Sequence, residues 1–252
     1  MIFTPNIISL KNFIIFFMIV LSSISCNDPY RPLTIGHRGA KGHIAENTLP
    51  SIAKAIELGV DGIEIDIFIC KSGELVVFHD KKLDRLTNSH GYIESLEYDS
   101  IRKISVLGEH KIPTLNEVFK LIDGKVFLNI ELKGSGTAEP THKLLKPLLK
   151  EKKWKPDQFI ISSFNWEELE IFYRLNKKVP IAILTGSDPL DAIPIAKKLN
   201  ALAINPSFRA LNIKNVKKIQ DEGYKVFPYT INEPTDIQRI LTLKVDGIIT
   251  DF

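Results

Sequence analysis

The sequence has little cysteine and no strong excess of charge. Only two cysteines, Cys26 and Cys70, occur in 252 residues, which excludes the disulfide framework that holds many small secreted domains together. The net charge of +3 comes from 33 basic and 30 acidic residues. This balance is too small to indicate a nucleic-acid partner, although it would not repel an anionic substrate. Apolar residues make up 44% of the chain, enough for one large core.

The sequence also lacks an apolar run long enough to span a bilayer. Phe13–Leu21 is unbroken and apolar, but a membrane span needs roughly 20 such residues. Lys11 precedes this run and small residues follow it, an order typical of a secretory signal. We therefore predict that residues 1–26 are a signal peptide and that the protein is exported to the periplasm or the cell surface.

Cys26 ends this predicted signal. The small residues before it resemble the cleavage box of bacterial lipoproteins, in which the cysteine is acylated, although Ser23 stands where such boxes usually carry Leu. Cleavage near this point by a general signal peptidase is the alternative. We expect a lipoprotein anchored to the membrane through Cys26, with residues 27–32 as a short linker. Cys70 lies in a strand-like run and is predicted to be a buried free thiol.

From Leu33 onward, short apolar strands alternate with helical patterns. The expected strands are Leu33–Gly36, Gly62–Ile69, Val126–Lys133, Phe159–Phe164, Ile181–Thr185, Ala201–Asn205, Lys225–Tyr229 and Gly247–Thr250. The expected helices are Asn47–Gly59, Leu115–Leu121, His142–Lys152, Trp166–Leu175, Leu190–Leu199, Val216–Glu222 and Thr235–Leu243. This alternation predicts an α/β fold, a (β/α)8 TIM barrel over residues 33–252. An open doubly wound sheet is the alternative, but no strand is followed by a Gly-rich phosphate loop.

One segment interrupts the alternation. Glu74–Asp80 reads as an additional strand, and Lys81–Lys111 is polar and irregular. We expect a short insertion after the second strand, at about residues 74–111, and long connections at the carboxyl end of a barrel are often functional. The sequence stops at Phe252, just after the last strand, so we expect an eighth barrel helix to be lacking or supplied elsewhere.

Acidic residues occur inside two of the predicted strands. Because side chains alternate along a strand, Glu64 and Asp66 share one face of the second strand and the intervening isoleucines share the other. The isoleucines can pack under helices, which turns both acids into the barrel mouth. The same alternation places Asn129, Glu131 and Lys133 inward on the next barrel strand.

Three inward carboxylates need compensation, because each buried charge carries a large desolvation cost. A divalent cation provides it, and oxygen ligands suit Ca²⁺ or Mg²⁺. Neutralisation by Arg38 and Lys133 alone is the alternative. A glycosidase would also use two carboxylates, but these flank the scissile bond instead of sharing one strand as Glu64 and Asp66 do.

His37 and His79 both lie at strand ends on the predicted rim. Two imidazoles on opposite sides of a phosphate can act as base and acid near neutral pH. The other histidines are expected to be structural or exposed: His43, His90, His110 and His142.

These residues form an ordered set of motifs that resembles the glycerophosphodiester phosphodiesterase family. The matching strings are His37-Arg38-Gly39, Glu46-Asn47-Thr48, Gly62–Asp66, His79-Asp80, Leu83 with Arg85 and Thr87, Pro113-Thr114-Leu115, Glu131-Leu132-Lys133, Ser162-Ser163-Phe164, Thr230-Ile231-Asn232 and Gly247–Asp251. The resemblance covers about residues 33–252. Two departures are Ala45, where proline is common, and Tyr229, a position often held by Trp, which bears on how the alcohol or glycerol moiety packs.

The resemblance implies a TIM-type barrel, one divalent cation (Ca²⁺ or Mg²⁺), and hydrolysis of small glycerophosphodiesters to an alcohol and glycerol 3-phosphate. It implies the following roles: metal ligands Glu64, Asp66 and Glu131; acid–base pair His37 and His79; phosphate-binding residues Arg38 and Lys133. It also makes the insertion part of the substrate cleft. We take His37 as base and His79 as acid, with water or the neighbouring glycerol hydroxyl as nucleophile, the latter through a cyclic phosphate.

Two other functions remain open at this point. A lysophospholipase D would use the same site with a wider apolar cleft. A non-catalytic surface lipoprotein that binds phosphodiesters or a partner protein would usually have lost a ligand or a histidine, and none is missing here. The sequence makes no prediction of the oligomeric state.

Overall fold

The computed structural model describes Met1 and residues 30–252. The predicted signal segment and the lipidation candidate Cys26 lie outside the described residues, Met1 aside. The chain divides into two units, Met1–Arg31 and Pro32–Phe252, and all elements described below belong to the second. None of the helices in the described part of the chain is long and apolar enough to cross a bilayer.

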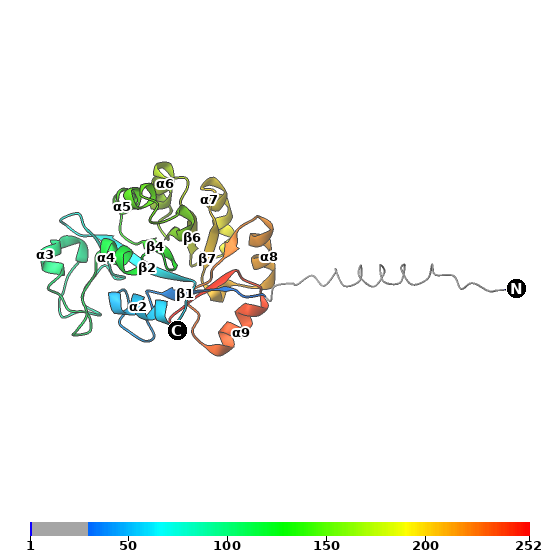
Figure 1. The fold of residues 1–252 in the computed structure, drawn as a ribbon, viewed down its shortest axis with the longest axis horizontal. Helices are drawn as coiled ribbons and strands as arrows, with labels where there is room; N and C mark the ends of the chain where they lie inside the picture. Colours follow the sequence, from blue (N-terminus) through cyan, green and yellow to red (C-terminus); the bar gives the residue numbers. More distant parts are fainter. Residues whose placement is uncertain (2–29) are drawn as a thin grey trace. The chain divides into compact units, whose positions relative to one another are not determined.

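Parallel strands form a nearly closed barrel in this unit (Figure 1). The barrel strands are β1 (Leu33–His37), β2 (Gly62–Ile69), β4 (Phe127–Leu132), β5 (Phe159–Ser163), β6 (Ile181–Thr185), β7 (Ala203–Pro206), β8 (Lys225–Val226) and β9 (Gly247–Thr250). They pair in the order β8-β7-β6-β5-β4-β2-β1-β9. Backbone hydrogen bonds from Asp246 N to Val226 O (3.1 Å) and from Ile249 N to Pro228 O (2.9 Å) join the two ends. The predicted (β/α)8 barrel is confirmed.

Helices surround the strands (Figure 1). They are α2 (Leu49–Glu57), α4 (Leu115–Ile122), α5 (Ala138–Lys150), α6 (Trp166–Leu175), α7 (Ile193–Lys198), α8 (Ile213–Asp221) and α9 (Pro234–Thr242). The side chain of Thr48 caps α2, and Thr114 with Glu117 forms a capping box at α4. The first turn of the predicted helix 190–199 is a 3-10 helix, Pro189–Ala192, so α7 is shorter than predicted. Within the described residues no helix follows β9.

Two apolar layers fix the strands. The isoleucines of β2 that alternate with its acids are fully buried, as predicted, in an apolar cluster that also contains residues of α2 and α4. Inside the barrel a second cluster fills the half of the interior that lies before the polar positions along the strands: Ile35, Ile160, Ala182, Ala203, Phe227 and Ile249. Because side chains alternate, the next inward position along each strand is left for other groups. On β1 this position is His37, which follows Ile35 by two residues.

The insertion is a compact unit with its own core. β3 (Leu75–Val77) pairs antiparallel with β2, the 3-10 helix Ile93–Ser95 and α3 (Tyr98–Ile101) follow, and α3 lies beyond α4 at the edge of the barrel unit (Figure 1). The extra strand is shorter than the predicted Glu74–Asp80. The stretch that reads as polar nevertheless buries an apolar cluster that includes Leu83, Ile93, Ile101, Ile104 and Val106. Cys70 is a buried free thiol at the edge of this cluster, as predicted.

Candidate active site

The register of the parallel strands places the inward polar side chains side by side. His37, the last residue of β1, pairs with Glu64 of β2, and Glu64 pairs with Asn129 of β4. Two residues further along, Asp66 pairs with Glu131. The carboxyl ends of the strands lie at the same end of the barrel, so these groups form one cluster there.

The three carboxylates of this cluster form a close triad. Glu64, Asp66 and Glu131 each offer an oxygen within 4.8 Å of the others, and they are only 4%, 1% and 8% exposed. The backbone N–H of Arg38 donates to Glu64 Oε2 (2.9 Å). Lys133 Nζ lies 3.0 Å from Glu131 Oε1 and 3.6 Å from Asp66 Oδ1. The guanidinium of Arg38 also lies 3.4 Å from Asp66 Oδ2. Two positive side chains, Arg38 and Lys133, are therefore in contact with a group of three buried acids.

The electrostatics show that this compensation is incomplete. Burial raises the pKa of Glu64 well above its usual value and that of Glu131 to about 8, and the charge of Asp66 adds to both shifts. Burial also opposes ionisation of Asp66, but Arg38 and Lys133 outweigh it and lower the pKa of that carboxyl. The two cations thus stabilise one ionised acid, not three.

This donor set fits a divalent metal ion. All the triad ligands are oxygens, as Ca²⁺ and Mg²⁺ prefer. The buried Oδ1 of Asn129, beside Glu64 in the register, has no hydrogen-bond partner in the described part of the chain. Neutralisation by Arg38 and Lys133 alone, the alternative raised from the sequence, leaves two of the carboxyl groups favouring the protonated form.

His37 is held from both sides of its ring. Its Nδ1 lies 2.6 Å from Asp251 Oδ1, and since a carboxylate only accepts, Nδ1 carries the proton. Asn232 Nδ2 donates to the other oxygen of Asp251 (2.9 Å). Nε2 of His37 accepts from Arg38 Nε (3.1 Å). Burial lowers the pKa of His37, although the hydrogen bond to Asp251 opposes this, so the ring is a neutral imidazole whose Nε2 lone pair is its acceptor.

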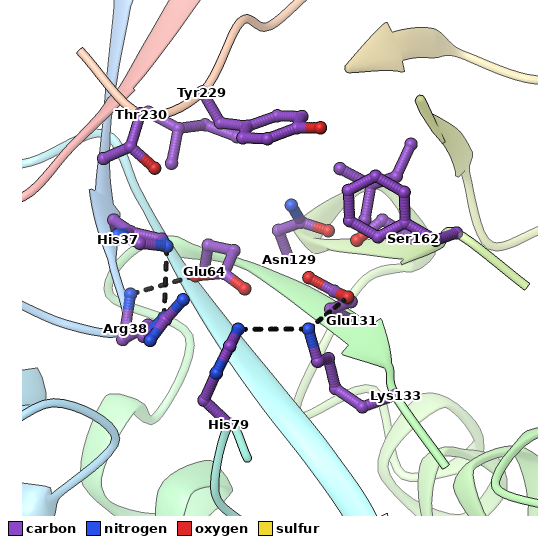
Figure 2. A pocket seen from close by; sticks show the side chains of 13 residues that line it. His37, Arg38, Glu64, His79, Asn129, Glu131, Lys133, Ser162, Tyr229 and Thr230 are labelled. Carbon is purple, nitrogen blue, oxygen red and sulfur yellow. Dashed lines mark hydrogen bonds and ion pairs between the residues drawn. The ribbon is translucent and has the colours of Figure 1, made fainter. Parts of the chain in front are cut away.

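His79 repeats this arrangement from the insertion. It lies two residues after β3, its Nδ1 donates to Asp80 Oδ1 (2.5 Å), and its Nε2 accepts from Lys133 Nζ (3.1 Å). Burial and the positive charges of Arg38 and Lys133 lower its pKa. Figure 2 shows both imidazoles on the same side of the pocket as the two cations.

The loop after β1 has a conformation that only particular residues allow. Arg38 has a φ of 54°, in the left-handed region, and this turn aims its backbone N–H at Glu64. Gly39 follows with a φ of 87°, and a Cβ there would lie 2.5 Å from Ser51 Oγ on α2. Strain of this kind persists where surrounding contacts fix it, often at functional sites. The left-handed conformation of Arg38 and the missing side chain of Gly39 therefore allow the loop after β1 to pack closely against α2.

The cavity has one charged wall and one largely apolar wall (Figure 2). Its volume is about 290 Å³, at the small end of ligand pockets. The apolar and aromatic residues of its lining are Phe164, Leu184, Tyr229 and Ile249. The rings of Phe164 and Tyr229 meet edge to face at 5.8 Å, and Tyr229 donates to the carbonyl oxygen of Thr185 (3.0 Å). Burial raises the pKa of Tyr229 to about 12, so its hydroxyl stays neutral.

The structure brings the residues singled out from the sequence to this one place. The cavity is lined by His37, Arg38, Glu64, His79, Glu131 and Lys133. Asp66 lies beneath its surface in contact with Lys133. The roles of these residues stay predictions. No other histidine among the described residues lines the cavity.

The sequence did not reveal the residues that orient this set. These are Glu46, Asp80, Arg85, Asn232 and Asp251. All of them occur in the matching motifs, and only the adjacency of Asp80 to His79 was a usable signal. Asp251 contacts His37 across 214 positions of sequence, so no local pattern announces the pair.

Comparison with known proteins gives consistent matches. Residues 37–252 match the model of the glycerophosphoryl diester phosphodiesterase family. A glycerophosphodiester phosphodiesterase of Caldanaerobacter subterraneus is 36% identical over 231 residues, 88% of this chain and 94% of the relative. A phosphodiesterase of Oleispira antarctica, solved in complex with the product sn-glycerol-3-phosphate, aligns with a TM-score of 0.80 and 28% identity over 87% of this chain and 93% of that one. A human lysophospholipase D is 24% identical over 86% of this chain and 82% of the relative.

We expect the triad to bind Ca²⁺ or Mg²⁺ in a pH-dependent way. Below the pKa of Glu131, about 8, the ion has to displace a proton, so affinity should fall by about tenfold or more for each pH unit below 8. Isothermal titration calorimetry at pH 6 and pH 8.5 measures this. Glu131→Gln and Asp66→Asn should weaken binding at both pH values, whereas Glu167→Gln, an exposed acid on α6, should not. Equal affinity in the triad variants and the wild type would rule out this ion site.

Proposed function

The chain belongs to the glycerophosphoryl diester phosphodiesterase family, and we propose that it hydrolyses glycerophosphodiesters to an alcohol and glycerol 3-phosphate with two histidines and a divalent ion. One observation carries this proposal. A single small cavity presents two neutral imidazoles, two cations and a buried triad of carboxylates. These groups suit an anionic phosphodiester, and the opposite wall suits its organic arms.

Arg38 and Lys133 bind the phosphate in this proposal. In the free protein each donates to the Nε2 of a histidine, Arg38 to His37 and Lys133 to His79. A phosphate oxygen is a stronger, charged acceptor than an imidazole. The substrate therefore draws both cations from the rings, and the same event frees both Nε2 lone pairs for proton transfer.

Glu64, Asp66 and Glu131 would hold the divalent ion. When bound, the ion supplies positive charge that stabilises the charge developing on the phosphoryl oxygens. The triad lies on β2 and β4, which are neighbours in the pairing order, so its positions are fixed by the barrel itself.

His37 acts as the base and His79 as the acid, because their carboxylates differ. Asp251 is held by the neutral amide of Asn232 and, at 3.5 Å, by Lys41, so much of its charge is left to stabilise a protonated His37. Asp80 is bound directly by Arg85 (2.5 Å), so its support for a protonated His79 is weaker. His37 Nε2 takes the proton from water or the glycerol hydroxyl. His79, neutral in the free protein, takes up a proton from solvent at Nε2 beside the bound anion and gives that proton to the departing alkoxide.

Glycerophosphocholine tests the activity directly. The purified protein should release choline and glycerol 3-phosphate, excess chelator should abolish turnover, and added Ca²⁺ or Mg²⁺ should restore it. Absence of hydrolysis with either ion would refute the proposed substrate class. Full activity in excess chelator would refute the role of the divalent ion but not the proposed hydrolysis of glycerophosphodiesters.

Lysophosphatidylcholine is the informative second substrate in this assay. Phe164 is 47% exposed at the apolar wall, and a lysophospholipase D occurs among the relatives, so an acyl chain is a reasonable occupant. The small cavity favours glycerophosphocholine. A higher kcat/KM on lysophosphatidylcholine would reassign the enzyme to lipid substrates.

Alanine variants test the two histidines. His37→Ala and His79→Ala should each lower kcat by about 10²–10⁴-fold, the usual contribution of a positioned acid or base. Circular dichroism melting should show that both variants stay folded. The matched control is His90→Ala in the insertion, whose side chain is 86% exposed and which should keep the wild-type rate. A near-normal rate in either active-site variant would remove that histidine from the mechanism.

We also propose export and lipid anchoring through Cys26, on the sequence of residues 1–26 alone. Expressed in a bacterial host, the wild type should incorporate labelled palmitate and sediment with membranes. Cys26→Ser should do neither, while Cys70→Ser should behave as the wild type because Cys70 is buried. Equal labelling of the wild type and the Cys26 variant would refute the anchor.

A further inference from the structure

A chain of charged side chains runs outside the cavity and joins the insertion to the barrel. Arg85, in the insertion, donates from Nη2 to Glu46 Oε1 (2.7 Å) and from Nη1 to Glu46 Oε2 (3.2 Å). Its Nε donates to Asp80 Oδ2 (2.5 Å). Arg85 itself does not line the cavity.

One end of this chain reaches the phosphate-binding cation. Glu46 Oε1 accepts from Arg38 Nη1 (2.6 Å) as well as from Arg85. The side chain of Glu46 is only 4% exposed, so its carboxylate depends on these two partners, both of which lower its pKa. The position of the Arg38 guanidinium is therefore linked to Arg85 through one buried carboxylate.

The other end reaches His79. Asp80 uses one oxygen for His79 Nδ1 and the other for Arg85 Nε. A carboxylate fixed at both oxygens fixes the plane and the tautomer of the imidazole. Arg85 is thus two contacts away from both a histidine and a cation of the cavity.

We propose that Arg85 is a positioning residue that sets Arg38 and His79 in their working geometry at the same time. The proposal rests on the proposed function for its activity measurements, and on the binding of phosphate by Arg38 for its binding measurement. Arg85 acts through Glu46 and Asp80 and touches no reacting atom.

A purely structural role for Arg85 is disfavoured by the insertion itself. That segment has its own buried apolar cluster, and β3 ties it to β2 by strand pairing. The side chain of Arg85 is 47% exposed, and its buried partner Glu46 keeps a second cation, Arg38, at 2.6 Å when Arg85 is removed. Its contacts are more valuable for orientation, since the pair with the buried Glu46 is bidentate.

The geometry also requires arginine rather than lysine. Three different nitrogens of Arg85 are used, two on Glu46 and one on Asp80. A guanidinium presents such a fork in one plane, whereas a single ammonium cannot reach both carboxylates in this way. Arg85→Lys therefore keeps the charge and loses the bridge.

Arg85→Ala and Arg85→Lys test the proposal, with Arg102→Ala and Arg102→Lys as matched controls. Arg102 is also in the insertion, and its ion pair among the described residues is with its near neighbour Asp99 (3.3 Å). Both Arg85 variants should lower kcat/KM on glycerophosphocholine by about 10–100-fold, as loss of an orienting partner does. Both should also bind glycerol 3-phosphate about tenfold more weakly by calorimetry, through Arg38. The control variants should match the wild type.

Guanidinium rescue separates positioning from folding. Guanidinium chloride at low millimolar concentration should restore part of the lost rate of Arg85→Ala, and NaCl at the same ionic strength should not. The losses in Arg85→Ala and Asp80→Asn should be less than additive, because both act on His79. Wild-type rates in both Arg85 variants would overturn the proposal. So would a loss that guanidinium does not restore and that follows a fall in Tm. An inactive wild type that still binds glycerol 3-phosphate would count against the proposed function alone, and the comparison of that binding between the wild type and the Arg85 variants would still decide the role of Arg85.

Discussion

The burial of three carboxylates side by side on two strands is the constraint on which the site depends. Glu64, Asp66 and Glu131 lie together because parallel pairing puts β2 and β4 in register. Each ionised group carries a large desolvation cost, and the raised pKa values of Glu64 and Glu131 show that the protein alone does not meet it. Cations must therefore be close by. Arg38 and Lys133 are near enough to contact the histidines as well, so the charge balance of the triad also sets the histidine hydrogen bonds.

The barrel makes this arrangement rigid by dividing its interior into layers. Apolar side chains fill the half of the interior that lies before the polar positions along the strands. The strands therefore cannot move independently where they carry the acids. The functional groups occupy the next inward positions, as His37 does above Ile35 on β1. His79 comes from outside this framework, since it lies in the insertion after β3. The precision of the site at that residue has to come from side-chain contacts instead of strand pairing.

The sequence predicted what depends on strand alternation, and it missed what depends on distant contacts. Alternation within β2 and β4 located the triad, because a two-residue period decides which face a side chain occupies. The predicted strand Lys225–Tyr229 is shorter in the structure, ending at Val226; Pro228, which has no N–H to donate, follows closely. Residues 81–111 were predicted to be polar and irregular, and no sequence pattern indicated the small core that they form, because the apolar residues of that core are spaced irregularly. The hydrogen bond between His37 and Asp251 joins residues 214 positions apart, so no local sequence pattern predicts it.

The two histidines show why residue identity alone does not assign a role. Both rings have the same tautomer, a carboxylate on Nδ1 and a cation on Nε2. The difference lies one contact further out. Asp251 accepts from a neutral amide, with Lys41 more distant at 3.5 Å, whereas Asp80 accepts directly from a guanidinium at 2.5 Å. A carboxylate already paired with arginine stabilises an adjacent imidazolium less than one paired with an amide. In the proposed mechanism this difference assigns the base and the acid. Arg85, which binds Asp80, also binds Glu46, and Glu46 in turn accepts from Arg38. The proposed mechanism therefore links proton transfer at His79 to phosphate binding at Arg38 through a residue of the insertion, Arg85.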